Sequence, residues 1–250
     1  MNDELEYLTK YRFTKEKIHV PHTKLEDIFN DSLLQKFLHG LMKDLKALNL
    51  KVTSSIFMKR YAFLAVIQLA VMSIYNKAFR LSKEQMYLQH EFKDGMWLPN
   101  FYFEDYSLVS LPDDVRRKEW RSEVISSLFK RHFNPLMNLL YKKTKISKKV
   151  LWENVFVYIS WFYESALEDK ELCEHHEILK DDYRFITDKA NGPLYGAYSE
   201  NPLTIFYEQR ERGVNIRKTC CFSYLIESKG GRCKTCPLIC NIEDIREVIR

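Results

Sequence analysis

Common nucleotide-binding and hydrolytic motifs are missing from this sequence of 250 residues. It has no G-x-G-x-x-G and no G-x-x-x-x-G-K-[ST], the glycine-rich loops that bind dinucleotides and nucleoside triphosphates. It also lacks G-x-S-x-G and H-E-x-x-H, which mark serine hydrolases and zinc proteases. A redox enzyme with this sequence would have no ordinary nicotinamide site, and it would take its electrons from another protein.

Glycine is scarce, and no dense basic stripe is present. The chain has 7 Gly against 16 Phe, 15 Tyr and 4 Trp, and 46% of its residues are hydrophobic. Few glycines and long apolar periodicity indicate a mainly helical body. The net charge of +5 is spread along the chain, unlike the charge of a nucleic-acid-binding protein, so we expect no nucleic-acid partner.

The sequence shows neither a secretory leader nor a membrane span. The first six residues, MNDELE, include three acidic residues and no basic one, and they lack the basic start and apolar core of a signal peptide. The most apolar run, residues 61–75, is shorter than the ~20 apolar residues that a spanning helix needs. We therefore expect a buried helix there and a cytoplasmic protein, with transient contact at the inner face of the membrane left open. In that compartment, clustered cysteines favour metal or redox chemistry over disulfides.

Hydrophobic spacing predicts an α+β fold that is mainly helical. The expected longer helices cover residues 31–49, 54–79, 112–143 and 150–167, and a short helix covers 204–212. Asn134-Pro135 should kink the third of these or start a new helix, and Ser147 should cap the fourth. Two aromatic-rich runs flank Lys93-Asp94-Gly95, and Asp-Gly between such runs is a strong hairpin signal. The sequence thus predicts a small antiparallel hairpin or sheet near residues 86–103, in which Pro99 places the second strand at an edge or in a bulge.

Cysteine is almost confined to the C-terminus. Five of the six cysteines lie in the last 31 residues, in a pattern of Cys220-Cys221, eleven residues, then Cys233-x2-Cys236. Thiolates are soft ligands that select zinc or iron–sulfur iron, so this pattern predicts a four-cysteine metal site. Structural zinc usually takes its thiolates from two C-x2-4-C turns. Neighbouring side chains point apart, and an adjacent pair therefore favours a wider two-iron cluster over one zinc ion.

The C-terminal motif resembles that of the FhuF-type ferric-siderophore reductases. It is R-K-T-C-C-F-S-Y-L followed by G-G-R-C-K-T-C-P-L, with a spacer one residue longer than is usual for the family. Weaker likeness extends upstream to Asn201-Pro202-Leu203, to Leu151-Trp152-Glu153-Asn154, and to Ser54-Ser55 before Lys59-Arg60. The resemblance implies a [2Fe–2S] cluster on Cys220, Cys221, Cys233 and Cys236. It also implies a helical body over residues 1–212 and a C-terminal iron–sulfur module over 213–250.

The same resemblance implies a function. The cluster would pass one electron to Fe(III) in a siderophore of hydroxamate, citrate or catecholate type, after accepting it from an external donor such as a ferredoxin or a flavoprotein. No side chain is expected to act as a catalytic acid, base or nucleophile. Positive charge near the cysteines suits an anionic ferric complex or an acidic donor. The candidate substrate contacts are Arg217, Lys218, Arg232 and Arg60.

Other interpretations stay open at this point. The cysteines could hold structural zinc in a binding module, or the protein could bind a siderophore without redox activity. Siderophore synthetases share a FhuF-like region, but they are much longer and carry nucleotide-binding parts that are missing here. His19 and His22 lack a nearby third ligand. Residues 171–176 around Cys173 are rich in potential ligands, but they are also typical of a solvated helix start, and Cys173 would need partners from elsewhere in the chain. Cys240 follows two apolar residues, so we interpret Cys240 as a small buried side chain.

Overall fold

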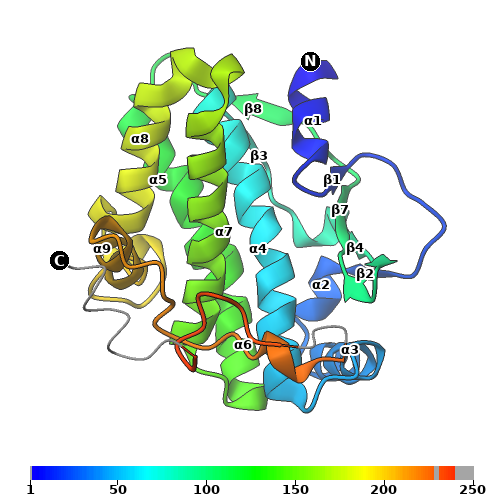
Figure 1. Ribbon diagram of the computed structural model, residues 1–250. Coiled ribbons are helices and arrows are strands. Elements are labelled where there is room, and N and C mark those ends of the chain that lie inside the picture. The colour runs from blue at the N-terminus through cyan, green and yellow to red at the C-terminus, as the bar shows by residue number, and fades with distance from the viewer. Residues whose placement is uncertain (1, 228–230, 240–250) are drawn as a thin grey trace.

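Two long helices form the centre of the computed structural model, which describes residues 2–227 and 231–239. Helices α4 (Leu50–Tyr75) and α7 (Lys148–Glu168) lie side by side along most of their length (Figure 1). The other helices pack around them: α1 (Asn2–Thr9), α2 (Leu25–Ile28), α3 (Asp31–Asp44), α5 (Arg117–Leu128), α6 (Asn134–Thr144), α8 (His176–Arg184) and α9 (Thr204–Glu211).

Helix α4 is the core helix of the body. Its residues are buried on nearly all faces, as its apolar sequence predicts. Among the described residues, it is the one helix long and apolar enough to cross a bilayer. However, 89% of its most apolar stretch is buried within the protein. The expectation of a buried helix here is confirmed.

The predicted ends of α4 were wrong at both sides. The helix begins at Leu50, not at Ser54 or Ser55, because the Asn49 side chain accepts a hydrogen bond from the Val52 amide at 3.1 Å. It ends at Tyr75 because Asn76 adopts a left-handed conformation with φ of 50°. Ser54 and Ser55 are therefore interior residues, which places Ser55 where it can contact the C-terminal segment.

The break predicted at Asn134-Pro135 is confirmed. A π-helical turn, Phe129–Phe133, joins α5 to α6, and Pro135 lies in the first turn of α6. Proline has no amide hydrogen to donate, so the backbone widens before it and the helix starts again. Ser147 caps α7 as predicted, since its hydroxyl accepts from the Lys149 amide at 3.2 Å.

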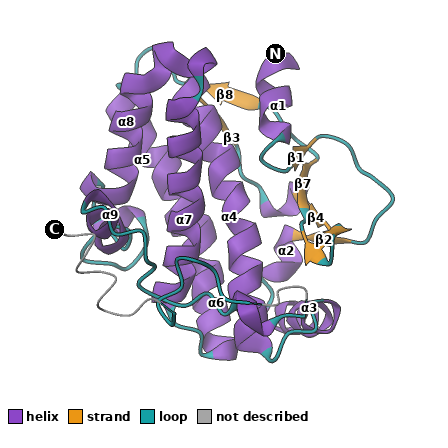
Figure 2. Cartoon of the chain, in the orientation of Figure 1, coloured by secondary structure: helices purple, strands orange, loops and turns teal. Residues whose placement is uncertain are grey.

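The strands lie mostly on one side of the helical core (Figure 2). The largest sheet has the order β1-β7-β4-β2, in which β1 is parallel to β7 and the other neighbours are antiparallel. Its strands are β1 (Phe13–Thr14), β2 (His22–Lys24), β4 (Met86–Gln89) and β7 (Asn100–Phe103). Two antiparallel pairs complete the strands: β3 (Lys77–Phe79) with β8 (Leu108–Ser110), and β5 (Phe92–Lys93) with β6 (Met96–Trp97).

The predicted hairpin is confirmed, and its turn is the expected one. Lys93 pairs with Met96 across Asp94 and Gly95, which have φ of 51° and 71°. Two-residue hairpin turns of type I′ need positive φ at both central residues, and Asp and Gly adopt positive φ more readily than most residues. The hairpin continues into the β4–β7 pair, so it reaches from the turn to the centre of the larger sheet.

The predicted role of Pro99 was wrong. Strand β7 is not an edge strand, because it lies between β1 and β4. No bulge forms either, since the pairs Gln89–Asn100 and Phe92–Trp97 keep one register through the hairpin. Instead, the hydrogen-bond ladder is interrupted at Leu98 and Pro99, between β6 and β7. Proline has no amide hydrogen, but at this position neither the β5–β6 pair nor the β4–β7 pair needs one.

The predicted fold class is confirmed: a mainly helical α+β protein with small sheets, antiparallel except for the β1–β7 pair, and a C-terminal cysteine-bearing segment. In Figure 1 that segment, drawn in orange and red, crosses the lower parts of α7 and α4. The short 3-10 helix η6 (Ser223–Leu225) packs on α4. The backbone also joins this region to the loop after α3, where the Leu48 amide donates to the Leu225 carbonyl at 3.2 Å.

Candidate metal centre

Two segments bring the predicted cysteines together. The Arg217 amide donates to the Thr235 carbonyl at 2.9 Å, which holds the segment before Cys220 against the turn that contains Cys233 and Cys236. Within that turn, the Cys236 amide donates to the Cys233 carbonyl at 2.9 Å. The sulfur atoms of Cys220 and Cys236 lie 3.9 Å apart. Residues from both halves of the motif therefore meet, as the four-cysteine prediction requires.

The adjacent pair Cys220-Cys221 directs its sulfurs to different neighbours. The Cys220 sulfur lies near Cys236, whereas the Cys221 sulfur lies 3.8 Å from the Lys59 ammonium and 3.2 Å from the Ser223 hydroxyl. Phe222 follows with φ of 59°, a left-handed conformation that is uncommon for a large residue. This turn lets the Phe222 amide approach the Cys220 sulfur at 3.4 Å, so a backbone donor is directed at a candidate ligand.

A buried carboxylate on α7 holds the backbone just before the cysteine pair. The two oxygens of Glu153 accept from the Lys218 amide at 2.6 Å and from the Thr219 amide at 2.8 Å. The Thr219 hydroxyl also donates to Glu153. Hydrogen bonds to a charged group are stronger than those between neutral groups. Glu153 therefore fixes the position of the residues that lead into Cys220.

A second buried network joins α4, α7 and the cysteine pair. The Ser55 hydroxyl donates to the Cys221 carbonyl at 2.7 Å, and the Asn154 amide donates to the Ser55 carbonyl and hydroxyl at 3.1 and 2.9 Å. Arg217 donates to the Asn154 side-chain oxygen at 2.7 Å and lies 3.5 Å from Glu153. The hydrogen bond from the Asn154 side chain to the Ser55 carbonyl agrees with the rule that a buried side-chain amide needs partners.

The charges around Cys221 favour its thiolate form. Burial alone raises the pKa of this thiol, but the positive charges of Lys59 and Arg217 and the hydrogen bonds of Ser223 outweigh burial and lower the pKa to about 7. Burial raises the pKa of Cys220, and its neighbours Cys236 and Cys221 raise it more. Burial likewise lowers the pKa of Lys59. Thiolate is the form that binds metals, so Cys221 is prepared for that role.

The donor set fits an iron–sulfur group. Cys221 and Cys236 are buried, Cys220 and Cys233 are partly exposed, and all four carry soft sulfur. In the described part of the chain, no three His, Cys, Asp or Glu side chains already converge on one point as for a small ion. Cys240, which we interpret as a non-ligand, lies outside the described residues.

The four candidate substrate contacts occupy different environments. Arg217 is buried and bonded to Asn154, whereas the Lys218 side chain is exposed. Arg232 is exposed, with its guanidinium 4.7 Å from the centre of the Tyr224 ring. Arg60 is half-buried on α4, so it lies on the helical body, apart in sequence from the cysteine segment.

Sequence reasoning gave too little weight to three residues around Cys221. The sequence pattern assigned no role to Lys59, and Glu153 and Ser223 entered only as parts of the family likeness. A signal for Glu153 was present, because a carboxylate inside an otherwise apolar and aromatic stretch must find buried partners. The positions of Lys59 and Ser223 next to Cys221 depend on the tertiary fold, which no local pattern reveals.

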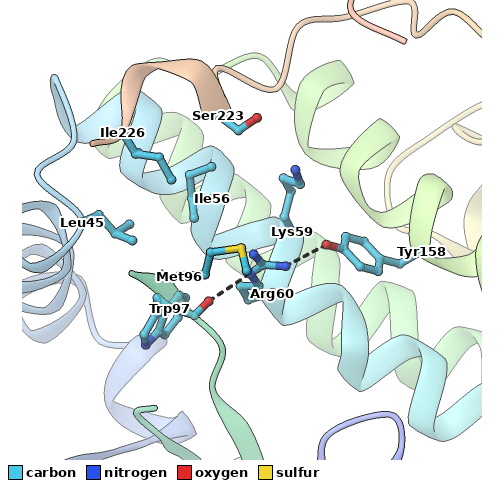
Figure 3. Close-up of a pocket in the computed structure, with 9 residues that line it drawn as sticks. All are labelled: Leu45, Ile56, Lys59, Arg60, Met96, Trp97, Tyr158, Ser223 and Ile226. Atoms are coloured by element: carbon cyan, nitrogen blue, oxygen red, sulfur yellow. Dashed lines mark hydrogen bonds between the residues drawn. The ribbon is translucent and has the colours of Figure 1, made fainter. Parts of the chain in front are cut away.

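Lys59 and Ser223, which both contact the Cys221 sulfur, also line a cavity of about 240 Å³. Figure 3 shows the apolar side chains Leu45, Ile56 and Ile226 on one side, and Lys59 and Tyr158 on the other. The nine lining residues come from five parts of the fold, namely the end of α3, α4, β6, α7 and the segment around η6: Leu45, Ile56, Lys59, Arg60, Met96, Trp97, Tyr158, Ser223 and Ile226. We call this space the Lys59–Arg60 cavity.

Two family models match the chain. One, described as ferric iron reductase FhuF-like transporter, covers residues 55–212, which is more than half of the chain. The other, described as FhuF 2Fe-2S C-terminal domain, covers residues 217–238 and includes all four predicted cysteines. A comparison with curated proteins finds no match. The second family match identifies the cofactor as a [2Fe–2S] cluster, in agreement with the prediction.

Proposed function

Because the chain belongs to the FhuF-like family of ferric iron reductases, we propose that it reduces Fe(III) held in a siderophore and so releases Fe(II). The observation that carries this proposal is that Lys218 and Cys221, within the cysteine motif, are bonded to α7 and α4 next to the Lys59–Arg60 cavity. Hard oxygen ligands hold Fe(III) far better than Fe(II), so the transfer of one electron is sufficient to loosen the chelate.

The proposed ligands of the cluster are Cys220, Cys221, Cys233 and Cys236. When bound, a [2Fe–2S] cluster supplies one-electron transfer at a potential that is set by nearby charge, hydrogen bonds and exposure. The contact between the two halves of the motif and the low pKa of Cys221 support this ligand set. Glu153 and Asn154 fix the backbone before and at the cysteine pair, and this limits how far the ligands can move.

The charges near Cys221 have a second role in the proposal. Lys59 and Arg217 place positive charge beside a group of thiolates, which stabilises the added electron and raises the reduction potential. The buried position of Arg217 suits this role and the support of Asn154 better than direct contact with a substrate. Among the predicted substrate contacts, the proposal therefore places Arg60 and the exposed Lys218 and Arg232 on the substrate side.

The proposed electron source is an external protein, because the sequence lacks the common nicotinamide-binding motif. A ferredoxin or a flavoprotein has the required chemistry. The partially exposed Cys233 lies in a turn that also carries Lys234 and follows Arg232, so an acidic donor could approach there. The proposal places the reaction in the cytoplasm, where released Fe(II) is available to other proteins.

An anaerobic titration tests the proposed activity. Chemically reduced protein is added to a ferric siderophore, and the loss of the charge-transfer band is followed together with the colour of an Fe(II)-specific chelator. We expect about one Fe(II) per cluster oxidised, and none from protein whose cluster has been removed. Absence of Fe(II) at stoichiometric reduced protein, with each chelate type tried, would contradict the proposed function.

A further inference from the structure

The Lys59–Arg60 cavity is lined by the two cations that give it its name. Within residues 2–227 and 231–239, neither Lys59 nor Arg60 forms an ion pair with an Asp or Glu side chain. The Lys59 ammonium instead approaches the Cys221 sulfur at 3.8 Å. Arg60 donates to the Trp97 carbonyl and the Tyr158 hydroxyl, each at 3.0 Å. Both contacts hold the guanidinium in place, but neither neutralises its charge.

A third cation adds to this positive field. Arg12 donates to the Leu98 carbonyl at 3.0 Å, next to the Trp97 carbonyl that Arg60 uses. Its pKa is lowered from the usual value by burial and then by the positive charge of Arg60, against smaller opposing effects of Tyr158 and Glu91. Partly buried cations that repel one another cost folding free energy, and a bound anion would offset that cost. The field of this region is thus prepared for a negatively charged ligand.

The cavity also has an apolar wall and a limited size. Leu45, Ile56 and Ile226 face the cations across it, as Figure 3 shows. Its volume of about 240 Å³ is below the ~300–1,000 Å³ of pockets that enclose a whole drug-sized ligand. A complete siderophore is larger than that. The cavity therefore suits one arm of a chelate, with a charged oxygen end toward Lys59 and Arg60 and the organic part against the apolar wall.

We propose that the Lys59–Arg60 cavity binds an anionic oxygen-donor arm of the ferric chelate, and that it selects chelates with a net negative charge. This inference rests on the proposed function and names the substrate class for it. Three monoanionic hydroxamates neutralise Fe(III), whereas three dianionic catecholates, or citrate with its spare carboxylates, leave negative charge. Catecholate and citrate chelates are thus the favoured substrates, and neutral tris-hydroxamates are the disfavoured ones.

The same cations assist the electron transfer. Fe(III) gains one electron and becomes Fe(II), so the bound chelate becomes one unit more negative while its iron–oxygen bonds are still intact. The electron comes from the reduced cluster, which the external donor then reduces again. Lys59 and Arg60 stabilise the more negative product, and no proton has to move during this step. Release of Fe(II) follows because oxygen donors hold it less strongly.

Gallium(III) chelates test the site without any redox reaction. Ga(III) has the charge and nearly the size of Fe(III) but is not reduced by the cluster. Binding of a Ga(III) tris-catecholate, Ga(III) citrate and a neutral Ga(III) tris-hydroxamate to the cluster-containing protein is measured by calorimetry at low salt and at high salt. We expect the two anionic chelates to bind at least about tenfold more tightly than the neutral one, with a preference that weakens at high salt.

Variants locate the binding to the cavity. Lys59→Gln and Arg60→Gln should each weaken binding of the anionic chelates by about tenfold or more, while Arg60→Lys should retain most of it. Lys51→Gln is the matched control, because Lys51 is an exposed lysine on the same helix and is not part of the cavity. If Arg60→Gln does not yield folded protein with a normal cluster spectrum, Lys59→Gln decides the test.

The outcomes separate this inference from the proposed function. Unchanged Ga(III) chelate binding in Lys59→Gln, or equal affinity for neutral and anionic chelates, would overturn the inference even if ferric chelates are reduced. Tight and Lys59-dependent binding of the anionic chelates supports it. If the matching Fe(III) chelates bind in this way but the reduced cluster never reduces them, the site stands as a binding site and the reductase proposal fails.

Discussion

The helical core and the cysteine segment are held in place by different interactions. Along α4 and α7, large apolar side chains such as Phe57, Leu64 and Trp152 are fully or almost fully buried. In the described residues of the cysteine segment, by contrast, Arg217 and the two residues after it bond to Glu153 and Asn154. The core therefore needs no metal to fold, while the positions of the cysteines depend on a few polar contacts and on the group that they bind.

The largest expected effect is loss of the cluster from serine variants. Ser at Cys220, Cys221, Cys233 or Cys236 should remove or strongly shift the visible absorption, because each removes one proposed thiolate ligand. The far-UV circular dichroism should stay close to that of the wild type, since the helical body does not depend on the cluster. Iron and sulfide analysis of each purified variant provides the measurement.

Two further cysteines serve as controls for these variants. Cys173 is exposed on the body, and Cys173→Ser should leave iron content and spectrum unchanged. Cys240→Ser should do the same under our interpretation of Cys240 as a non-ligand. Loss of iron from Cys240→Ser, together with a normal spectrum in Cys220→Ser or Cys221→Ser, would show that the four-cysteine ligand set is wrong.

A substitution in the core should have the opposite pattern. Phe57 is fully buried on α4, and Phe57→Ala should lower the free energy of unfolding by about 3–5 kcal/mol through lost burial and a cavity. Phe92→Ala is the control, because Phe92 is 48% exposed at the hairpin and should change the stability by less than about 0.5 kcal/mol. Denaturant unfolding of the cluster-free proteins measures both. Equal effects of the two variants would contradict the proposed position of the core.

His132 makes the stability of the helical body depend on pH. Burial, and then the charge of Lys83, lower the pKa of His132 from 6.5 to about 4. Between these values the unfolded chain binds a proton that the folded protein does not, so stability falls as the pH is lowered through this window. The loss attributable to this residue is about 3 kcal/mol at most, and it is absent above pH ~6.5.

The variant His132→Gln should make this pH dependence shallower. Its side chain can still accept from the Tyr61 hydroxyl, which lies 3.3 Å from the His132 ring nitrogen. Unfolding free energies of the wild type and the variant at several pH values between about 4 and 7 give the comparison. Curves that remain parallel across this window would show that His132 does not titrate as described.

The smallest of these effects concerns the contact between α7 and the cysteine segment. Glu153→Gln removes a charged acceptor of two backbone amides, so the segment should lose about 1.5–3 kcal/mol of local stability. We expect faster cluster loss to an iron chelator and faster hydrogen exchange at Lys218 and Thr219. Glu164→Gln on the same helix is the control, since Glu164 pairs with Arg210 at a more exposed position and its pair contributes at most about 1 kcal/mol.

The sequence predicted the features that depend on local pattern. The Asp-Gly turn requires only φ values that those two residues adopt readily, and the prediction was confirmed at Asp94 and Gly95. The apolar run of α4 predicted a buried helix for the same local reason. The family motif identified the cofactor, because its spacing is distinctive enough to match residues 217–238.

The features that depend on tertiary contacts could not be predicted in this way. Ser55 was expected at the start of a helix, but Asn49 caps that helix and leaves Ser55 inside the fold, against Cys221. Pro99 was expected at an edge, but an interruption of the hairpin admits it between two paired regions. Lys59 and Cys221 are 162 positions apart, so their contact is a property of the packed structure alone.

The most direct test of the account is a stopped-flow experiment that follows the cluster and the chelate together. Reduced protein is mixed anaerobically with an anionic ferric chelate, and re-oxidation of the cluster is recorded alongside loss of the chelate band. The account predicts that both changes share one rate constant, that one cluster is oxidised for each Fe(III) lost, and that excess Ga(III) chelate slows both. Loss of the chelate band without re-oxidation of the cluster, or re-oxidation without loss of Fe(III), would contradict it.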